Sequence, residues 1–310
     1  MDDRTSRPGP GASVPDPGEV VAGVRLTPSE RPLFGFSKSD LARYFERASA
    51  WILAHAGDRP LAIVRCARGS EACQVQRHAT ADLPSLIHRA QIPEGTRTRT
   101  VFSVDSTQGL VALAQIGCVE LRPWNARVSE LGTPDRMIFG VEPARGIPWG
   151  RTVEAAKELR AVLESRGLRS FAKLSGARGI HVLVPLSPEH GWEEVRGFAR
   201  RIAEGLARRR PSRYAARRTK GRILIHVAGN AQGGTAVAAY SPRARRGLPV
   251  SMPVSWEELT PDLPPDAFPV PEALERLQRI PEDPWTGFHR LAQTLPQDGP
   301  IPGRGDESQA

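Results

Sequence analysis

The chain has 310 residues, of which 39% are hydrophobic, and carries a formal net charge of +9. This length allows one large domain or two small ones, with enough apolar residues for a sizeable core. The sequence has no run of about 18 apolar residues and no apolar signal segment at its N-terminus, which argues against a membrane helix and against secretion. The positive charge favours a phosphate-rich partner but does not by itself establish nucleic-acid binding.

Both ends of the chain are predicted to be disordered. Residues 1–19 and 291–310 are rich in proline, glycine and polar residues and poor in the apolar residues that a core needs. We therefore expect one folded domain over residues 20–290.

The three cysteines are interpreted as inert thiols. Cys66, Cys73 and Cys118 are too few and too scattered for a disulfide framework, and no Cys-x-x-Cys pair suggests a metal site. A reducing cytoplasm is therefore the expected compartment.

The first half of the domain predicts a mixture of helices and strands. Ser37 and Asp40 form the pattern of a capping box at the start of a helix over residues 38–56, whose apolar residues recur at helical spacing. Further along, we expect strands at 61–66, 73–77 and 118–121 and a helix at 107–116.

The second half has a more regular pattern. We expect, in order, a strand at 136–140, a helix at 151–166, strands at 170–174 and 180–184, a helix at 192–208 and strands at 222–227 and 235–240. The first six elements run strand–helix–strand–strand–helix–strand, which is the split βαβ pattern of ferredoxin-like folds. That fold serves many unrelated functions, so it decides none by itself.

An ordered series of segments carries a family resemblance. It includes DRMIFGVEP, FAKLSGARGIHVLVPL, GRILIHVAGN and TAVAAYSPRARRGLPVSMPVSWEEL, in that order. From about Leu26 to Phe288, the chain resembles the polymerase domain, of the archaeo-eukaryotic primase type, of bacterial DNA ligase D, which serves in non-homologous end joining.

The resemblance implies an α+β primase-polymerase fold. In it, a split βαβ palm of the RRM or ferredoxin-like kind packs against an N-terminal α/β subdomain. The N-terminal subdomain is then expected over residues 20–134, the palm-like core over 135–250 and a C-terminal wrap over 251–290.

The expected metal centre lacks most of its acids. The family carries Asp-x-Asp at the positions of Gly140 and Glu142, and a third acid at the position of His226. Phosphoryl transfer with two Mg²⁺ or Mn²⁺ ions needs several carboxylate oxygens at one point, so metal binding is expected to be weak or absent here. Glu142 and His226 could instead hold one transition metal, or they could be ordinary residues at strand ends.

Two basic segments are implied to bind a nucleoside triphosphate. In the first, Ser175, Arg178 and His181 match the family's contact positions, and Lys173 adds charge. The alternative is a simple hairpin whose glycines adopt positive φ and whose histidine packs in the core.

The second basic segment contains Ser241, Arg243 and Arg245, which the resemblance also assigns to the triphosphate. Residues two apart on an extended chain share a face, so both arginines can point to one phosphate group. A hydrated basic loop is the alternative.

Arg31 and Lys38 match the positions with which the family grips the 5′-phosphate of a DNA end. Lys38 stands at the start of the predicted helix, where the helix dipole also favours an anion. The alternative is that both are ordinary surface charges.

The preferred hypothesis is a DNA-end-binding protein of bacterial double-strand-break repair with reduced or no polymerase activity. Its expected partners are gapped or broken duplexes with 5′-phosphates, a nucleoside triphosphate, Ku and a separate ATP-dependent DNA ligase, since no Lys-x-Asp-Gly ligase motif is present. It is expected in the cytoplasm, at the nucleoid when bound to DNA.

Two rival hypotheses remain open. One is an active Mn²⁺-dependent primase-polymerase that fills gaps in end joining, with Asp105 or Glu120 as a further acid. The other is a scaffold without catalysis that recruits repair partners. Whether the chain is an enzyme therefore stays undecided at the level of sequence.

Overall fold

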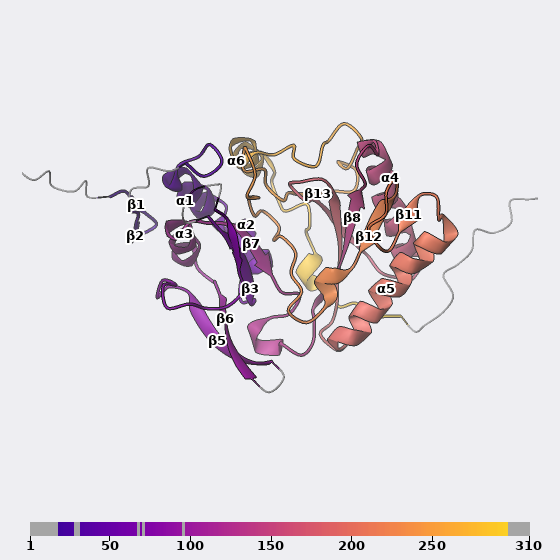
Figure 1. Ribbon diagram of the computed structural model, residues 1–310, viewed down its shortest axis with the longest axis horizontal. Coiled ribbons are helices and arrows are strands. Elements are labelled where there is room, and N and C mark those ends of the chain that lie inside the picture. Colours follow the sequence, from indigo (N-terminus) through magenta and orange to yellow (C-terminus); the bar gives the residue numbers. More distant parts are fainter. Residues whose placement is uncertain (1–17, 28–31, 67–68, 70–71, 95–96, 297–310) are drawn as a thin grey trace, which may run out of the picture.

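The computed structural model describes residues 18–27, 32–66, 69, 72–94 and 97–296 (Figure 1). A six-stranded sheet forms one half of the molecule. Its four central strands are β12 (Ile223–His226), β8 (Arg136–Pro143), β10 (Ile180–Pro185) and β9 (Phe171–Leu174), in that spatial order, and each is antiparallel to its neighbours. This is the strand order of a split βαβ fold, so the predicted α+β palm is confirmed.

Two helices cover one face of this sheet. Helix α4 (Trp149–Glu164) contacts β8 and β10, and α5 (Trp192–Arg209) contacts β8 and β12. Both bury the apolar positions that recur every three or four residues, as the sequence predicts. Figure 1 shows them on the outer side of the sheet, so the opposite face is turned toward the N-terminal half.

Short strands extend the sheet at both edges. Strand β11 (Tyr214–Ala215) runs parallel to β12, and β13 (Pro253–Val254) runs antiparallel to β9. Helix α6 (Val270–Arg279) and a short 3₁₀ helix (Phe288–Arg290) follow toward the C-terminus. The sequence patterns did not predict these four elements, because each is short or lies in a proline-rich stretch.

The N-terminal half is built on a three-stranded sheet. Its strands are β4 (Gln74–Gln76), β3 (Leu61–Arg65) and β7 (Cys118–Pro123), in that order, and α3 (Thr107–Gln115) packs beside β7. A tiny β1–β2 pair (Val20–Val21 and Val24–Arg25) and a hairpin of β5 (His88–Glu94) and β6 (Arg97–Ser103) complete this half. The hairpin was not predicted, because its polar residues mask the strand periodicity.

The first predicted helix is present but divided. Ser37 and Asp40 form the expected capping box, with the Asp40 amide donating to Ser37 Oγ at 3.0 Å. Ala48, with φ −90° and ψ 3°, then separates α1 (Lys38–Arg47) from α2 (Ser49–Ala56). The prediction of a single helix over 38–56 is therefore wrong, because two shorter helices cover this stretch.

The strand predicted at 235–240 does not form. The amide of Ala238 donates to Leu121 O at 2.8 Å, and that of Tyr240 donates to Ser251 O at 2.8 Å. The amides thus bond to two separate segments of the chain, so no continuous ladder develops along this stretch.

Buried polar contacts join the two halves. The Tyr44 hydroxyl donates to Tyr240 O at 2.7 Å, and Arg59, only 1% exposed, pairs with Asp135 through a 2.8 Å bond. Burial alone would raise the pKa of Asp135, but Arg136 and Arg59 together lower it to about 2. Asp135 therefore stays ionised and holds two arginines at the junction of the halves.

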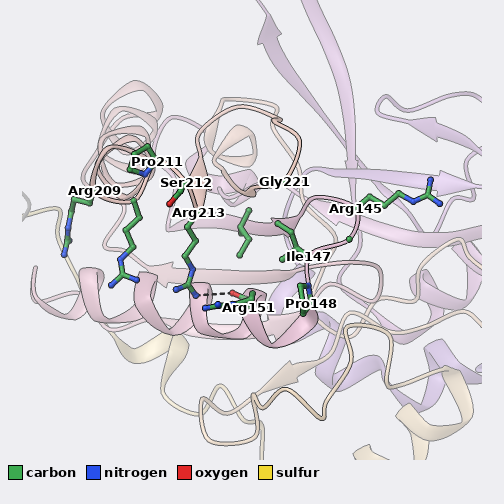
Figure 2. A pocket seen from close by; sticks show the side chains of 12 residues that line it. Arg145, Ile147, Pro148, Arg151, Arg209, Pro211, Ser212, Arg213 and Gly221 are labelled. Atoms are coloured by element: carbon green, nitrogen blue, oxygen red, sulfur yellow. Dashed lines mark hydrogen bonds between the residues drawn. The ribbon is translucent and has the colours of Figure 1, made fainter.

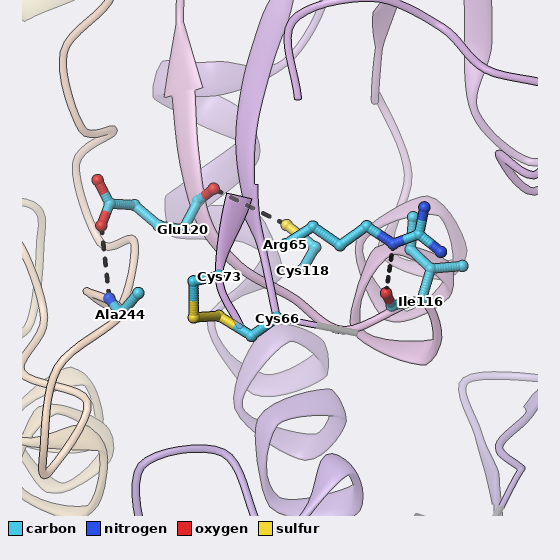
Figure 3. Close-up of a disulfide and its surroundings, with 7 residues drawn as sticks. All are labelled: Arg65, Cys66, Cys73, Ile116, Cys118, Glu120 and Ala244. Atoms are coloured by element: carbon cyan, nitrogen blue, oxygen red, sulfur yellow. Dashed lines mark hydrogen bonds between the residues drawn. A yellow bond between two sulfur atoms is a disulfide. The ribbon is translucent and has the colours of Figure 1, made fainter. Parts of the chain in front are cut away.

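The interpretation of all three cysteines as free thiols is wrong. Cys66 and Cys73 form a disulfide with a Cα–Cα distance of 4.1 Å, while Cys118 is a buried free thiol (Figure 3). In the antiparallel pair β3–β4, Arg65 lies opposite Gln74, so the next pair outward is Cys66 and Cys73. The hairpin register brings the two thiols together, which spacing alone does not reveal.

Within the described ranges, no helix is both long enough and apolar enough to cross a membrane.

Candidate functional site

Pairing across three strands gathers the residues of the expected metal centre. Gly140 on β8 lies directly opposite His181 of β10 on one side and His226 of β12 on the other. Directly paired residues point to the same face, and so does Glu142, two residues beyond Gly140. The sheet therefore brings Gly140, Glu142 and His226 together, as the sequence predicts, and adds His181 beside them.

Glu142 and His226 interact with each other. Nε2 of His226 lies 3.2 Å from Oε1 of Glu142, and Arg218 donates to Oε2 of the same carboxylate at 3.2 Å. The hydrogen bond from His226, with Arg218 adding its charge, lowers the pKa of Glu142 to about 2. Both carboxylate oxygens are thus engaged by cationic or hydrogen-bonding groups of the chain itself.

The imidazole of His226 occupies the space next to Gly140. A Cβ added to Gly140 would lie 2.2 Å from Nε2 of His226, closer than nonbonded atoms approach one another. A residue with a side chain at position 140 therefore requires the imidazole to move. The present position of His226 depends on the glycine.

A cavity of about 210 Å³ opens in front of this face. Side chains from β7 of the N-terminal half, from the palm strands and from two loops line it. Its charged and histidine lining residues are Glu120, Arg122, Glu142, Arg178, His181, His226, Arg243 and Arg245. Four arginines against two glutamates make it a cavity suited to an anion such as a phosphate chain.

The loop Ser175–Gly179 forms one wall of the cavity. Gly176 adopts φ +65°, and the Ser175 hydroxyl accepts hydrogen bonds from the amides of Ala177 and Gly179 at 3.2 and 3.1 Å. These two amides already have a partner within the loop. Arg178 is exposed at the cavity, so its guanidinium offers the charge that this loop can give to a ligand.

His181 lies deeper in the same cavity. Its side chain is 8% exposed, and its Nδ1 has no hydrogen-bond partner among the described residues. Burial, with the nearby Lys173 adding to it, holds the pKa of His181 well below its usual value, so the ring is neutral at pH 7. A neutral imidazole with a free buried nitrogen could bond to a ligand that enters the cavity.

Glu120 organises the arginines of the cavity. Its carboxylate, 3% exposed, accepts from Arg122 at 2.6 Å and from Arg243 at 2.9 Å. Arg243 also donates to Ser175 O at 2.5 Å, which ties it to the first basic segment. The sequence named Glu120 only as one possible acid, and the pairing with Arg243, 123 residues away, carries no local signal.

The other acid considered from sequence lies elsewhere. Asp105 pairs with His88 at 2.9 Å, and neither residue lines the cavity.

Two residues expected to bind nucleotide have other contacts. Lys173 is buried and donates to Val237 O at 2.8 Å and to Ser251 Oγ at 2.6 Å, and burial lowers its pKa well below the usual value. Ser241 is also buried, and its hydroxyl accepts from the amide of Leu121 at 2.9 Å. Neither side chain lines the cavity, whereas Arg243 and Arg245 of the same prediction both do.

The expected DNA-end site lies at the start of α1. Nζ of Lys38 donates to Thr27 O at 3.0 Å and to Thr27 Oγ1 at 3.1 Å, and partial burial lowers its pKa. Its third proton has no acceptor among the described residues and is open to an anion. Arg31, the other predicted contact, falls outside the described residues.

The residues at Gly140, Glu142 and His226 do not fit a pair of hard cations. Over the described ranges, no group of three histidine, cysteine or acidic residues is placed to hold a metal ion. The one carboxylate at this point is held by His226 and Arg218, and a guanidinium beside it opposes a second positive charge. Glu142 and His226 are adjacent, but they supply only two ligands.

Comparison with known proteins agrees with this architecture. Residues 37–285 match the family model described as LigD, primase-polymerase domain. The multifunctional non-homologous end joining protein LigD of Pseudomonas aeruginosa is 35% identical over 286 residues, which cover 89% of this chain and 34% of that protein. The bifunctional LigD protein of Bacillus subtilis is 27% identical, covering 86% of this chain and 43% of that one.

A solved structure, the polymerase domain from Mycobacterium tuberculosis ligase D in complex with DNA, is similar to most of this chain. It superposes with a TM-score of 0.80 at 26% identity, covering 87% of this chain and 99% of that one. The chain thus spans less than half the length of the curated relatives but nearly all of the solved domain. It belongs to the LigD primase-polymerase domain family.

Proposed function

We propose that this chain is a DNA-end-binding member of the family that acts in double-strand-break repair with little or no polymerase activity. The observation that carries the proposal is that the imidazole of His226 fills the space where a side chain at position 140 would lie. A Cβ added to Gly140 would be 2.2 Å from Nε2 of His226. With Glu142 alone at this point, and paired to Arg218, the Mg²⁺ or Mn²⁺ expected in the family would bind weakly or not at all.

Nucleotide binding through the phosphates is the second part of the proposal. The cavity of about 210 Å³ is smaller than most ligand pockets, which start at about 300 Å³. It has room for a phosphate chain held by Arg178, Arg243 and Arg245, with the nucleoside outside. His181 and Ser175 would add polar contacts, and Lys173 and Ser241 would support the wall from behind.

DNA-end binding is proposed at the start of α1. Lys38, at the first position of α1, is the described candidate for the 5′-phosphate, and the family resemblance assigns Arg31 to the same phosphate. The M. tuberculosis domain was solved in complex with DNA, which supports a similar partner here. Ku and a separate ATP-dependent ligase are proposed as protein partners, and the bacterial cytoplasm, at the nucleoid when bound, as the location.

The deciding experiment measures extension and binding on one preparation. A gapped duplex with a 5′-phosphate is incubated with nucleoside triphosphates and either Mg²⁺ or Mn²⁺, and binding is followed by fluorescence anisotropy. We expect binding without extension above the level of a Glu142→Ala/His226→Ala variant. Extension that this variant loses would overturn the proposal in favour of an active Mn²⁺-dependent polymerase, and absence of DNA binding would favour a scaffold.

The end-binding site has its own matched control. Lys38→Gln should reduce the preference for a 5′-phosphate over a 5′-hydroxyl end, whereas Lys157→Gln, which removes an exposed lysine of α4, should not. An unchanged preference in Lys38→Gln would place 5′-phosphate recognition elsewhere on the protein.

A further inference from the structure

A second, larger basic cavity lies on the other side of the palm sheet. Its volume is about 760 Å³, and it is lined by the loop after β8, the start of α4 and the turn that leads from α5 to β11 (Figure 2). Five arginines line it: Arg145, Arg151, Arg209, Arg210 and Arg213. Figure 2 shows Arg209 and Arg145 toward opposite ends, with Arg151 and Arg213 between them.

The carboxylates beside this cavity offset only part of its charge. Glu154 pairs with Arg151 at 3.2 Å and with Arg213 at 2.8 Å. Glu158 pairs with Arg210 at 3.2 Å. Two negative charges thus face five positive ones, and the excess is available to a ligand.

Arg145 and Arg209 carry that excess. Both are exposed, and neither forms an ion pair with any acidic residue in the described part of the chain. The N-terminus of α4 adds to the positive potential, since it has no side-chain cap and no acidic residue in its first turn. A guanidinium and a helix N-terminus both favour phosphate oxygens.

The rest of the lining is small or aliphatic, apart from one serine. Among the described residues that form it, the others are Gly146, Ile147, Pro148, Pro211, Ser212, Gly221 and Ile223. None of these seven residues has an aromatic ring on which a base could stack, and Ser212 is the one among them with a polar side chain. Contacts confined to phosphate position a nucleic acid without reading its sequence.

The cavity is continuous in sequence with the candidate site. Gly221 lines the cavity, and the segment just before it carries the exposed Arg217, Arg218 and Lys220. Arg218 in turn contacts Glu142 at 3.2 Å. Exposed basic residues therefore follow one another along the chain from Glu142 to the cavity, an arrangement that suits a strand better than a small isolated ligand.

We propose that this arginine cavity binds the phosphodiester backbone of a nucleic-acid strand that continues past the candidate site, without sequence preference. The inference rests on the proposed DNA-binding function and assigns to it a second contact surface. Its substrate chemistry is repeated phosphates held by Arg145 and Arg209 at the two ends of the cavity.

The test compares two double variants of the full chain. Arg145→Gln/Arg209→Gln removes the two unpaired charges of the cavity, and Arg200→Gln/Arg290→Gln removes two exposed arginines elsewhere. Affinity for a duplex with a long single-stranded extension is measured by anisotropy over a range of salt concentrations. We expect the cavity variant to bind this DNA roughly tenfold more weakly. The slope of log affinity against log salt concentration should also become shallower by about 1.4, because two phosphate contacts of about 0.7 each are lost.

The outcomes separate this inference from the proposed function. If the parent chain binds no DNA, both fail; if it binds and the cavity variant behaves as the control variant does, the inference alone fails. Arg145→Lys/Arg209→Lys should restore most of the affinity, which distinguishes lost charge from lost folding. If tripolyphosphate binds the parent but not the cavity variant while DNA affinity is unchanged, the cavity takes a small anion and the strand proposal is wrong.

Discussion

His226 and Gly140 are paired across β12 and β8, and the imidazole of the first fills the side-chain space of the second. The side chains at these two positions are therefore not independent in space. An acid placed at position 140 alone would meet the imidazole, and an acid placed at position 226 alone would face a glycine. This coupling gives the first prediction.

Gly140→Ala should displace His226 and break its hydrogen bond to Glu142. The imidazole is 34% exposed and can rotate away, so we expect a loss of only about 1 kcal/mol in the free energy of unfolding. In a His226→Ala background the same change should cost less, because nothing then occupies the space. Urea denaturation of the four proteins measures the coupling, and additive effects would show that the contact is absent.

Asp135 should make stability fall in acid. Its ordinary pKa of 3.8 is lowered to about 2 in the folded protein. Ionised Asp135 therefore makes its full contribution to the free energy of unfolding at pH values above 3.8. That contribution, about 2 kcal/mol, is lost as the pH falls through the lower value. Asp135→Asn should remove this acid dependence.

The same variant should also be less stable at neutral pH. It leaves Arg59 and Arg136 buried without their shared carboxylate, at a cost of about 3 kcal/mol. Urea denaturation at several pH values measures both effects. Equal stability of the parent and Asp135→Asn at neutral pH would contradict the proposed role of this carboxylate.

The disulfide between Cys66 and Cys73 should stabilise the N-terminal sheet. It closes a short loop, with a sequence separation of 7, for which the loss of chain entropy in the unfolded state predicts about 2 kcal/mol. Dithiothreitol should therefore lower the Tm of the parent protein but not that of Cys66→Ser/Cys73→Ser. If thiol titration of the untreated protein finds all three cysteines free, the crosslink is absent.

Variants of Lys173 and Arg178 should distinguish a residue that stabilises the cavity wall from one that binds the ligand. Lys173→Met should lower stability by about 1–2 kcal/mol, because Val237 O and Ser251 Oγ lose their donor, and leave triphosphate affinity unchanged. Arg178→Gln should lower triphosphate affinity roughly tenfold without a loss of stability, because its guanidinium is exposed at the cavity. If both variants lost triphosphate affinity equally, Lys173 would have to contact the ligand.

The sequence predicts the palm well because its pattern is local. Strand alternation and the apolar stripes of α4 and α5 follow from residues two to four apart, and the order of elements then selects the split βαβ topology. The same local patterns predict strands that contain Gly140 and His226 or end just before Glu142, and the pairing of β8 with β12 brings the three residues together.

The parts that the sequence misses depend on distant or register-dependent contacts. Cys66 meets Cys73 only because β3 and β4 pair in one register, and Glu120 meets Arg243 only after both halves fold. The arginine cavity beside Gly221 likewise forms only when the loop around Arg145 completes it. The Lys173 ammonium is also held by the carbonyl of Val237, 64 residues away, which no local pattern predicts.

The bond between Glu120 and Arg243 has a kinetic consequence. Glu120 comes from β7 and Arg243 from the segment between β12 and β13, so the small cavity keeps its geometry only while these two segments stay docked. A transient separation of the halves would scatter the arginines while the palm strands remain hydrogen bonded. Native-state hydrogen exchange should then detect a partial opening in which the amide of Leu121, bonded to Ser241 Oγ, exchanges before those of β8. A ligand that bridges the halves would slow this opening, so occupancy of the cavity could be read from a single backbone amide.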